Sequence, residues 1–154
     1  MTHTPRPHTL GIDIGTFESK GVLVDAKGRI TAQASRPHKM LVPRAGWAEH
    51  RADEDWWGDF VHITKELLNQ SGLDPAEIKA VAASAIGPCM LPVDSAGKPL
   101  MNGVLYGVDT RATDQIAALN ARIGEATIHH RCGNALTSLS LMIRRPPRST
   151  PFKK

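Results

Sequence analysis

Three short segments near the start of the chain, two apolar and one alternating, constrain its fold more than any other feature. They cover residues 9–14, 21–24 and 30–35. Gly15-Thr16 follows the first segment, and the turn-forming run Asp25-Ala26-Lys27-Gly28 follows the second. Connections this short join antiparallel strands, because a parallel crossover needs about a dozen residues or more. The sequence therefore predicts an antiparallel β-meander.

A helix is predicted after a loop over residues 37–52. Four apolar side chains recur at i, i+4, i+7 and i+11, which places them on one helical face: Trp56, Phe60, Ile63 and Leu67. Asp53 is expected to cap the start of this helix, and Gly72 is expected to end it. The helical phase also predicts that Trp56 and Trp57 are core residues.

Shorter patterns complete the expected order of elements. Asp74-Pro75 predicts a short helical turn, and residues 79–85 are small and apolar, as in a buried strand. Residues 90–93 and 100–105 are expected to be strands on either side of a turn over 94–97, and residues 111–123 are expected to be helical. Strands followed by mixed helices and strands predict an α/β fold with a mixed sheet.

Composition excludes several classes of protein. The chain has 154 residues, of which 41% are hydrophobic and 22% charged, so we expect one globular domain or part of a larger one. No stretch is long and apolar enough to span a membrane, and the N-terminus lacks the apolar core of a signal peptide. The two cysteines, Cys89 and Cys132, exclude a disulfide framework and suit a reducing cytoplasm.

The net charge of +4 is concentrated at the C-terminus. The last fourteen residues hold five basic and no acidic residues, whereas residues 1–140 carry 14 basic and 15 acidic ones. Phosphate-backbone binding needs basic side chains distributed over a folded face, so a nucleic-acid partner is not expected. Residues 141–154 have no helical or strand period, and we interpret them as a basic, proline-bearing tail that is non-native or disordered.

The residues around the first turn have the chemistry of a phosphate site. Gly15 lets backbone N–H groups approach phosphate oxygens, Thr16 adds a hydroxyl donor, and Asp13 can hold a hydrated Mg²⁺. Lys20 on the returning strand supplies a point charge for a terminal phosphate. The alternative is purely structural: Asp13 is a polar residue of an edge strand, and Gly15 is a turn residue.

Residues 11–16 (Gly-Ile-Asp-Ile-Gly-Thr) and 20–25 resemble the first phosphate hairpin of the actin-like ATPase superfamily. Three later segments are similar to motifs of the FGGY carbohydrate kinases, in the same order and spacing. They are residues 46–50 (Gly-Trp-Ala-Glu-His), 105–111 (Leu-Tyr-Gly-Val-Asp-Thr-Arg) and 133–138 (Gly-Asn-Ala-Leu-Thr-Ser). Residues 9–140 are thus identified as an incomplete FGGY N-terminal domain.

This resemblance implies a ribonuclease H-like fold and transfer of the ATP γ-phosphoryl group, with Mg²⁺, to a sugar or polyol hydroxyl. It places the catalytic aspartate in the part of the family pattern that would follow residue 154, so we expect this chain alone to be inactive. A homodimer of the full-length protein is possible on the same basis. The alternatives are a non-catalytic nucleotide- or sugar-binding module and an activator-type ATPase, which would need cluster-ligating cysteines.

The resemblance also implies a set of substrate-binding residues, each with a structural alternative. Trp47 either stacks on a sugar ring or anchors its loop beneath the following helix. Glu49 either accepts hydrogen bonds from sugar hydroxyls or lies on the surface. Asp109 and Arg111 either line the sugar site with Tyr106 or pair with each other, and Asp109 is alternatively the cap of the helix that begins at Arg111. The sugar itself is not specified.

Overall fold

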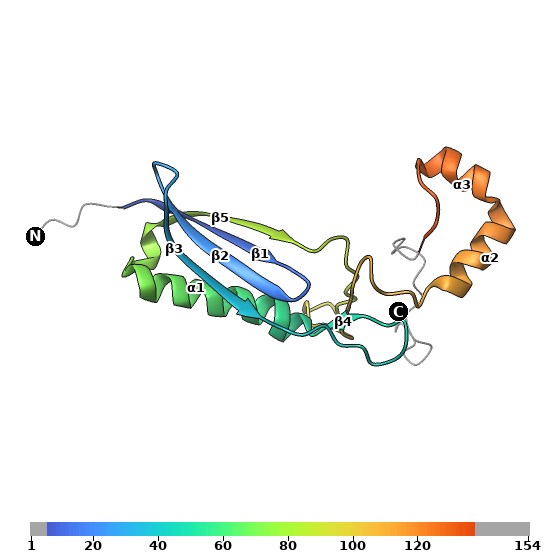
Figure 1. Cartoon of the computed structure of the whole chain (residues 1–154), viewed down its shortest axis with the longest axis horizontal. Coiled ribbons are helices and arrows are strands. Elements are labelled where there is room, and N and C mark those ends of the chain that lie inside the picture. Colours follow the sequence, from blue (N-terminus) through green and yellow to red (C-terminus); the bar gives the residue numbers. More distant parts are fainter. Residues whose placement is uncertain (1–5, 138–154) are drawn as a thin grey trace, which may run out of the picture.

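The computed structural model describes residues 6–137, and its body is a four-stranded sheet with one long helix against it (Figure 1). The strands, in spatial order, are β3 (Ile30–Pro37), β2 (Glu18–Asp25), β1 (His8–Ile14) and β5 (Ile78–Ala85). Strand β2 is antiparallel to both β3 and β1, and β5 runs parallel to β1. The predicted meander and mixed α/β sheet are confirmed.

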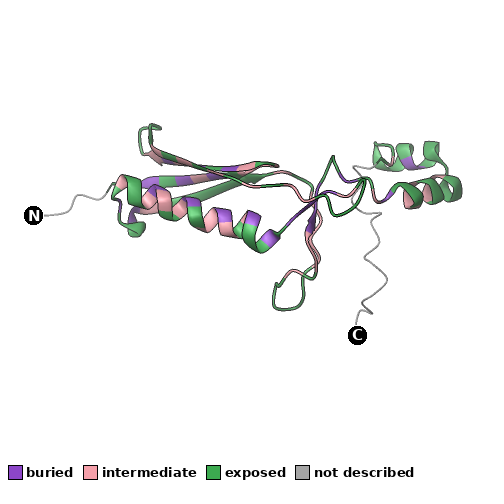
Figure 2. Ribbon diagram, turned by 60° about the horizontal axis from the view of Figure 1, so that its bottom comes forward, coloured by how far each residue is buried: buried purple, intermediate pink, exposed green. Residues whose placement is uncertain are grey.

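The core lies between this sheet and helix α1 (Gly58–Ser71). Alternate side chains of β1 and β2 face the helix, where Leu10, Ile12 and Leu23 pack against Ile63 and Leu67. Figure 2 shows the buried residues concentrated between these two layers. Gly21 allows their close approach, because a Cβ atom there would lie 2.4 Å from the Ile63 side chain.

The start of α1 differs from the prediction, whereas its end agrees. A π-helical segment, η1 (Ala52–Trp57), precedes the helix, so Asp53 lies inside a helical turn and is exposed rather than capping it. Asp55 instead accepts a hydrogen bond from the backbone N–H of Arg51 at 2.9 Å. Gly72 ends α1 with φ of 61°, a conformation that favours glycine.

The prediction that both tryptophans are core residues is wrong for Trp57. Its side chain is 65% exposed and stacks on Phe60, with ring centroids 5.4 Å apart. Trp56 is half-buried and lies against Gly103, where an added Cβ would meet the indole ring. Successive helical residues point about 100° apart, so neighbouring side chains cannot both face one partner.

Strand β5 is confirmed, but the prediction that it is buried is wrong. Residues 79–85 are all exposed. The helix packs against β3, β2 and β1. The described residues provide β5 with one strand neighbour, β1, at the edge of the sheet.

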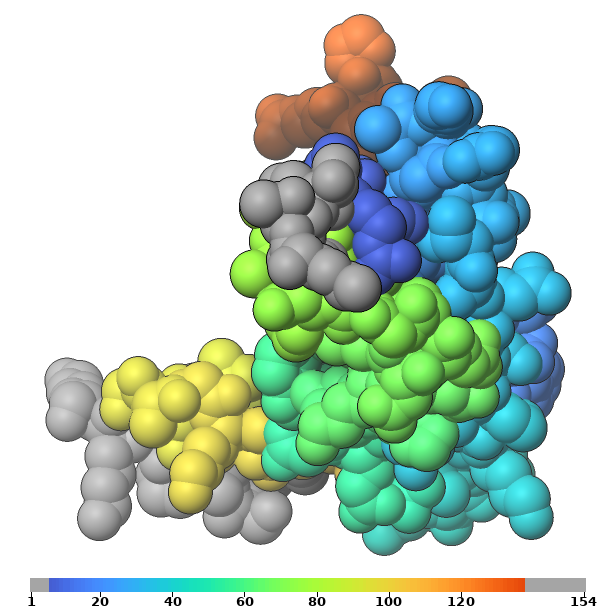
Figure 3. Space-filling model, turned by 90° about the vertical axis from the view of Figure 1, so that its left-hand side faces the viewer, coloured from blue at the N-terminus to red at the C-terminus, as the bar shows by residue number. Residues whose placement is uncertain are grey.

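Two short strands form a second sheet beyond the end of the first: β4 (Glu49–His50) and β6 (Gly103–Val104). Only β6 remains of the longer strands predicted over 90–93 and 100–105, together with isolated bridges such as Val93–Pro99. Pro92 and Pro99 have no N–H group to continue a ladder. The predicted turn is present, since Gly97 N–H donates to Asp94 O at 3.0 Å, and this segment projects from the body in Figure 3 (yellow).

Short helical elements complete the described part of the chain. Asp74 caps the helical turn η2 (Pro75–Glu77) through a capping box, as the sequence predicts. Helix α2 (Thr113–Ile123) begins two residues later than expected, and α3 (Glu125–Cys132) was not predicted. Both lie away from the main sheet in Figure 1. Within the described range no helix is long and apolar enough to cross a membrane, and the predicted tail over 141–154 lies outside that range.

Candidate phosphate and substrate site

The sheet face opposite α1 carries three polar side chains from three neighbouring strands. Asp13 is paired with Lys20 on β2 and with Ser84 on β5, so all three side chains share one face. They line a groove of about 350 Å³ whose other walls include small side chains. The Ser84 hydroxyl donates a hydrogen bond to the Asp13 carboxylate. Ser84 was not predicted, because only the parallel pairing of β5 with β1 places it beside Asp13.

The β1–β2 turn at the end of this groove requires glycine at its first position. The N–H of Gly15 donates to Glu18 O at 3.1 Å, and a Cβ at Gly15 would lie 2.7 Å from that same oxygen. Thr16 is half-buried in the turn, and Phe17 at its tip is exposed. Lys20 pairs with Glu18 at 3.2 Å, and its side chain is largely exposed.

Two buried histidines that the sequence did not single out support this turn. His38 contacts Gly15 O through Nε2 at 3.1 Å and the Asp59 carboxylate through Nδ1 at 2.7 Å. His50 contacts Thr16 O through Nε2 at 3.0 Å. Nothing local distinguishes His38, and although His50 ends the 46–50 motif, its contact with Thr16 spans 34 residues of the chain.

Glu49, Asp109 and Arg111 form a second cluster, which we term the acid–arginine clamp. The Arg111 guanidinium lies 2.7 Å from Glu49 Oε1 and 2.7 Å from Asp109 Oδ2, and its side chain is only 10% exposed. It also lies over the Trp47 ring, 3.9 Å from the centroid. Asn102 donates to the second Glu49 oxygen at 2.9 Å. Glu49 is therefore buried, which excludes a surface location for it.

Asp109 is fully buried and ionised within the clamp. Burial opposes its ionisation, but hydrogen bonds from the Arg111 side chain and from the Ala48 N–H outweigh this and hold the pKa of Asp109 below its ordinary value of 3.8. The predicted pairing of Asp109 with Arg111 is confirmed. Its predicted capping role is wrong, because α2 begins at Thr113 and has no side-chain cap.

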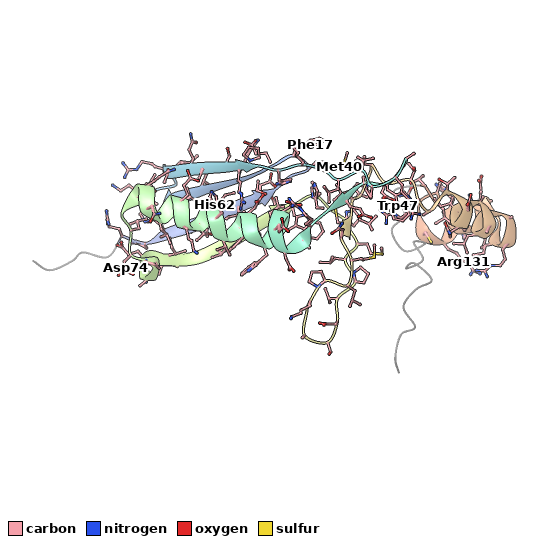
Figure 4. The ribbon with its side chains drawn as sticks, turned by 90° about the horizontal axis from the view of Figure 1, so that it is seen from below. Phe17, Met40, Trp47, His62, Asp74 and Arg131 are labelled. Atoms are coloured by element: carbon pink, nitrogen blue, oxygen red, sulfur yellow. The ribbon has the colours of Figure 1, made fainter. Side chains whose placement is uncertain are left out.

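Trp47 and Tyr106 have more exposed surface than the clamp. Trp47 is half-buried between its loop and two cations, with the Arg44 guanidinium 4.9 Å from its ring centroid. In Figure 4 it lies beyond Met40, on the side toward the terminal helices. Trp47 is held by Arg44 and Arg111 rather than beneath helix α1. Tyr106 is 37% exposed, and it precedes the clamp residues Asp109 and Arg111 in the same segment of the chain.

Strand β4 links the two groups of predicted residues. Glu49 reaches the acid–arginine clamp, and the next residue, His50, reaches the turn at Thr16. Successive side chains of a strand point to opposite sides, so a two-residue strand is enough to touch both. The structure thus joins the predicted phosphate residues to Glu49, Asp109, Arg111 and Trp47, and it leaves Tyr106 at the margin.

The mixed sheet that begins with an antiparallel meander agrees with the fold that the resemblance to the actin-like ATPases implies. Residues 8–142 match the FGGY family of carbohydrate kinases, N-terminal domain. Because this match covers most of the chain, the chain belongs to that family.

Curated relatives and solved structures agree with this assignment. A glycerol kinase of Azorhizobium caulinodans is 37% identical over 114 residues, which are 73% of this chain and 22% of the relative. A xylulose kinase structure from Rhodospirillum rubrum has a TM-score of 0.75 at 26% identity and matches 86% of this chain and 27% of its own. Plasmodium falciparum glycerol kinase with ADP has a TM-score of 0.75 at 19% identity and shares the fold, over 90% of this chain and 28% of its own. The chain spans about a quarter of the length of these proteins.

Proposed function

We propose that this chain is the N-terminal part of an ATP-dependent sugar or polyol kinase, and that it forms one wall of the cleft in which phosphoryl transfer takes place. The observation that carries this proposal is the open sheet face, where Asp13, Lys20 and Ser84 lie beside a turn that requires Gly15. Membership of a carbohydrate kinase family supplies the reaction class.

The residues on the open face fit ATP and Mg²⁺. Magnesium at phosphate-transfer sites is commonly held by one or two carboxylates, the phosphates and water. Asp13 offers one such carboxylate, which would hold the ion through water, with the phosphates as further ligands. ATP supplies the transferred group, and Mg²⁺ neutralises its charge. Lys20 is placed to exchange its exposed partner Glu18 for a phosphate oxygen.

For the acceptor side we propose a division of roles. Glu49, Asp109 and Arg111 satisfy one another, and their side chains are at most 10% exposed, so they hold the loops in place. Trp47 and Tyr106 keep exposed surface and are the residues from this group that we expect to contact the substrate. The sequence holds two cysteines, Cys89 and Cys132, too few for a disulfide framework, and this supports the proposal of a cytoplasmic protein.

Asp13→Asn tests the phosphate site. Amide chemical shifts of the ¹⁵N-labelled chain are followed while Mg²⁺-ATP is added, and we expect the perturbation to centre on residues 13–20. The substitution should weaken the response about tenfold, because a charge-assisted contact is lost. Asp114→Asn, on the exposed surface of α2, is the matched control. Perturbation that is insensitive to Asp13→Asn would contradict the proposal.

We further propose that this chain alone does not turn over ATP, which separates it from a self-sufficient enzyme. A coupled ADP-release assay with a panel of polyols and sugars should remain at background. The second candidate, a non-catalytic nucleotide- or sugar-binding module, is favoured by the well-formed turn and groove within this one domain. Calorimetry distinguishes the two, because a module should bind Mg²⁺-ATP or a sugar tightly, whereas half a cleft should bind both weakly.

A further inference from the structure

All three carbonyl groups at the β1–β2 turn accept hydrogen bonds from two segments of the protein. Gly15 O accepts from the His38 ring, Thr16 O from the His50 ring, and Phe17 O from the His38 backbone N–H at 2.9 Å. These are three consecutive peptide units of the turn. Their orientation is therefore fixed by His38 and His50, which lie outside the turn itself.

Fixing the carbonyls also fixes the amides. In a trans peptide the C=O and the following N–H point in opposite directions. The peptide plane that directs Gly15 O toward His38 therefore directs the Thr16 N–H away from His38. In the next peptide, Thr16 O points toward His50, and the Phe17 N–H therefore points away from His50. Among residues 6–137 neither of these amides has a backbone partner. Two unpaired N–H groups beside Asp13 and Lys20 are the donors that a bound anion requires.

The Trp56 indole N–H, which can only donate, lies 3.0 Å from His50 Nδ1, so His50 is neutral and carries its proton on Nε2. His38 lies between two acceptors, the Gly15 carbonyl at Nε2 and the Asp59 carboxylate at Nδ1. The two rings meet edge to face, with centroids 4.8 Å apart.

The surrounding groups favour a neutral His50 ring. Arg36 and His38 both contact the Asp59 carboxylate, at 3.3 and 2.7 Å. Burial and then the charge interaction with His38 lower the pKa of His50, whereas the hydrogen bond to Thr16 O and then the charges of Asp55 and Asp59 oppose this shift. His50 thus favours the neutral form that can accept from Trp56 and donate to Thr16.

We propose that His38 and His50 are positioning residues that turn the Thr16 and Phe17 amides toward the phosphates of the nucleotide. This inference rests on the proposed function, since it assigns to those amides the phosphates of Mg²⁺-ATP. It adds two residues, from β4 and from the loop after β3, to a site that otherwise consists of β1, β2 and β5.

Paired substitutions separate the ring contacts. His38→Gln keeps a donor near the Nε2 position for Gly15 O, whereas His38→Asn keeps the donor to Asp59 and loses the one to Gly15. His50→Gln retains a donor to Thr16 O, and His50→Leu removes it at similar volume. His62→Gln, on the exposed side of α1, is the control for removal of a histidine. Thermal unfolding identifies the variants that fold. His38→Gln, His50→Gln and His38→Asn each keep a polar side chain of similar size, so these three are expected to fold.

Two measurements on the ¹⁵N-labelled 154-residue chain provide independent readouts. Without ligand, amide shifts and relaxation report the orientation and mobility of residues 15–17, and imidazole ¹⁵N shifts report the Nε2 proton of His50. We expect His38→Asn and His50→Leu to lower the order parameters of Thr16 and Phe17 below about 0.6. With Mg²⁺-ATP, the same two variants should bind about tenfold more weakly, whereas both glutamine variants stay within about twofold.

The outcomes distinguish the two proposals. Unchanged amide shifts and mobility of residues 15–17 in His38→Asn and His50→Leu would overturn the positioning role. Glutamine variants that lose as much turn order and Mg²⁺-ATP affinity as His38→Asn and His50→Leu would overturn it as well. If the unmodified chain gives no response to Mg²⁺-ATP, the proposed phosphate site fails in this chain, and the ligand-free measurement still decides whether the two histidines orient the turn.

Discussion

The sheet–helix body and the acid–arginine clamp are held together by different interactions. In the body, alternate residues of β1 and β2 bury aliphatic side chains against Ile63 and Leu67 of α1. In the clamp, one arginine bridges two buried carboxylates and covers an indole ring. The first arrangement is non-directional and tolerant, whereas the second depends on the position of every donor and acceptor.

The difference shows how the fold separates stability from recognition. The apolar body fixes the direction of β1 and β2, and this leaves the opposite face of the same strands free for Asp13 and Lys20. The clamp contributes no large apolar core, but it joins the segments around β4 and β6 to residues 109–111. His50 connects the two regions, because it belongs to β4 and contacts the β1–β2 turn.

The largest effect is expected in the body. Ile63→Ala should lower the free energy of unfolding by about 2–5 kcal/mol, because it removes a fully buried side chain and leaves a cavity. Val81→Ala, on the exposed strand β5, should change it by less than about 0.5 kcal/mol. Urea denaturation measures both values. Similar losses for the two variants would show that β5 is covered in solution and that the apolar body extends over this edge strand on the helix side of the sheet.

A smaller loss is expected in the clamp. Asp109→Asn should lower the free energy of unfolding by about 1–3 kcal/mol, because it removes the charge that faces Arg111 and places an amide group against existing donors. Asp53→Asn, which changes an exposed carboxylate, is the control and should have an effect within about 0.5 kcal/mol. The same urea titrations compare them, and equal effects would contradict a structural role for the clamp.

The body was largely predictable from the sequence, and the reason is local. Side-chain alternation along residues 9–35 and helical spacing from Phe60 to Leu67 report on which face of an element is apolar, without reference to its neighbours. Gly72 and Asp74 likewise mark an end and a cap through their own backbone chemistry. The burial of β5 could not be read in this way, since it depends on which elements lie over it.

The clamp and the turn supports were not predictable on the same basis. Arg111 and Glu49 are 62 residues apart in sequence, and His38 and Gly15 are 23 apart. Only the resemblance to a family singled out Glu49, Asp109 and Arg111. The pairing of Asp109 with nearby Arg111 was predicted, but the pairing of Arg111 with Glu49 was not. His38 and Ser84 had neither a local pattern nor a family motif to identify them.

The pH dependence of stability should show the burial of His50 beside His38. The folded pKa of His50 lies below its ordinary value of 6.5, so the unfolded chain binds more protons below that pH. The contribution of His50 is therefore complete above pH 6.5 and decreases as the pH falls toward its folded pKa. Carboxylates such as Asp109 lose their contribution only below about their ordinary pKa of 3.8.

Urea midpoints between about pH 7.5 and 4.5 measure this effect, and His50→Gln is the informative variant. It should flatten the loss of stability on acidification below pH 6.5, because the glutamine side chain does not titrate. The exposed residue His62 provides the comparison through His62→Gln, which should leave the slope unchanged. An unaltered slope in His50→Gln would assign the pH dependence to other groups.

The smallest effect on stability is expected on the open face, where function and folding should be separable. Lys20→Met removes an exposed pair with Glu18, and such pairs contribute about 0–1 kcal/mol, so the free energy of unfolding should hardly change. Affinity for Mg²⁺-ATP should fall about fivefold, as expected for one lost charge contact near the surface. Lys27→Met, at the opposite end of β2, is the matched control and should leave both quantities unchanged. Equal losses of affinity from the two variants would mean that lysine acts only through net charge, and the open face would then lack a specific place for the phosphate.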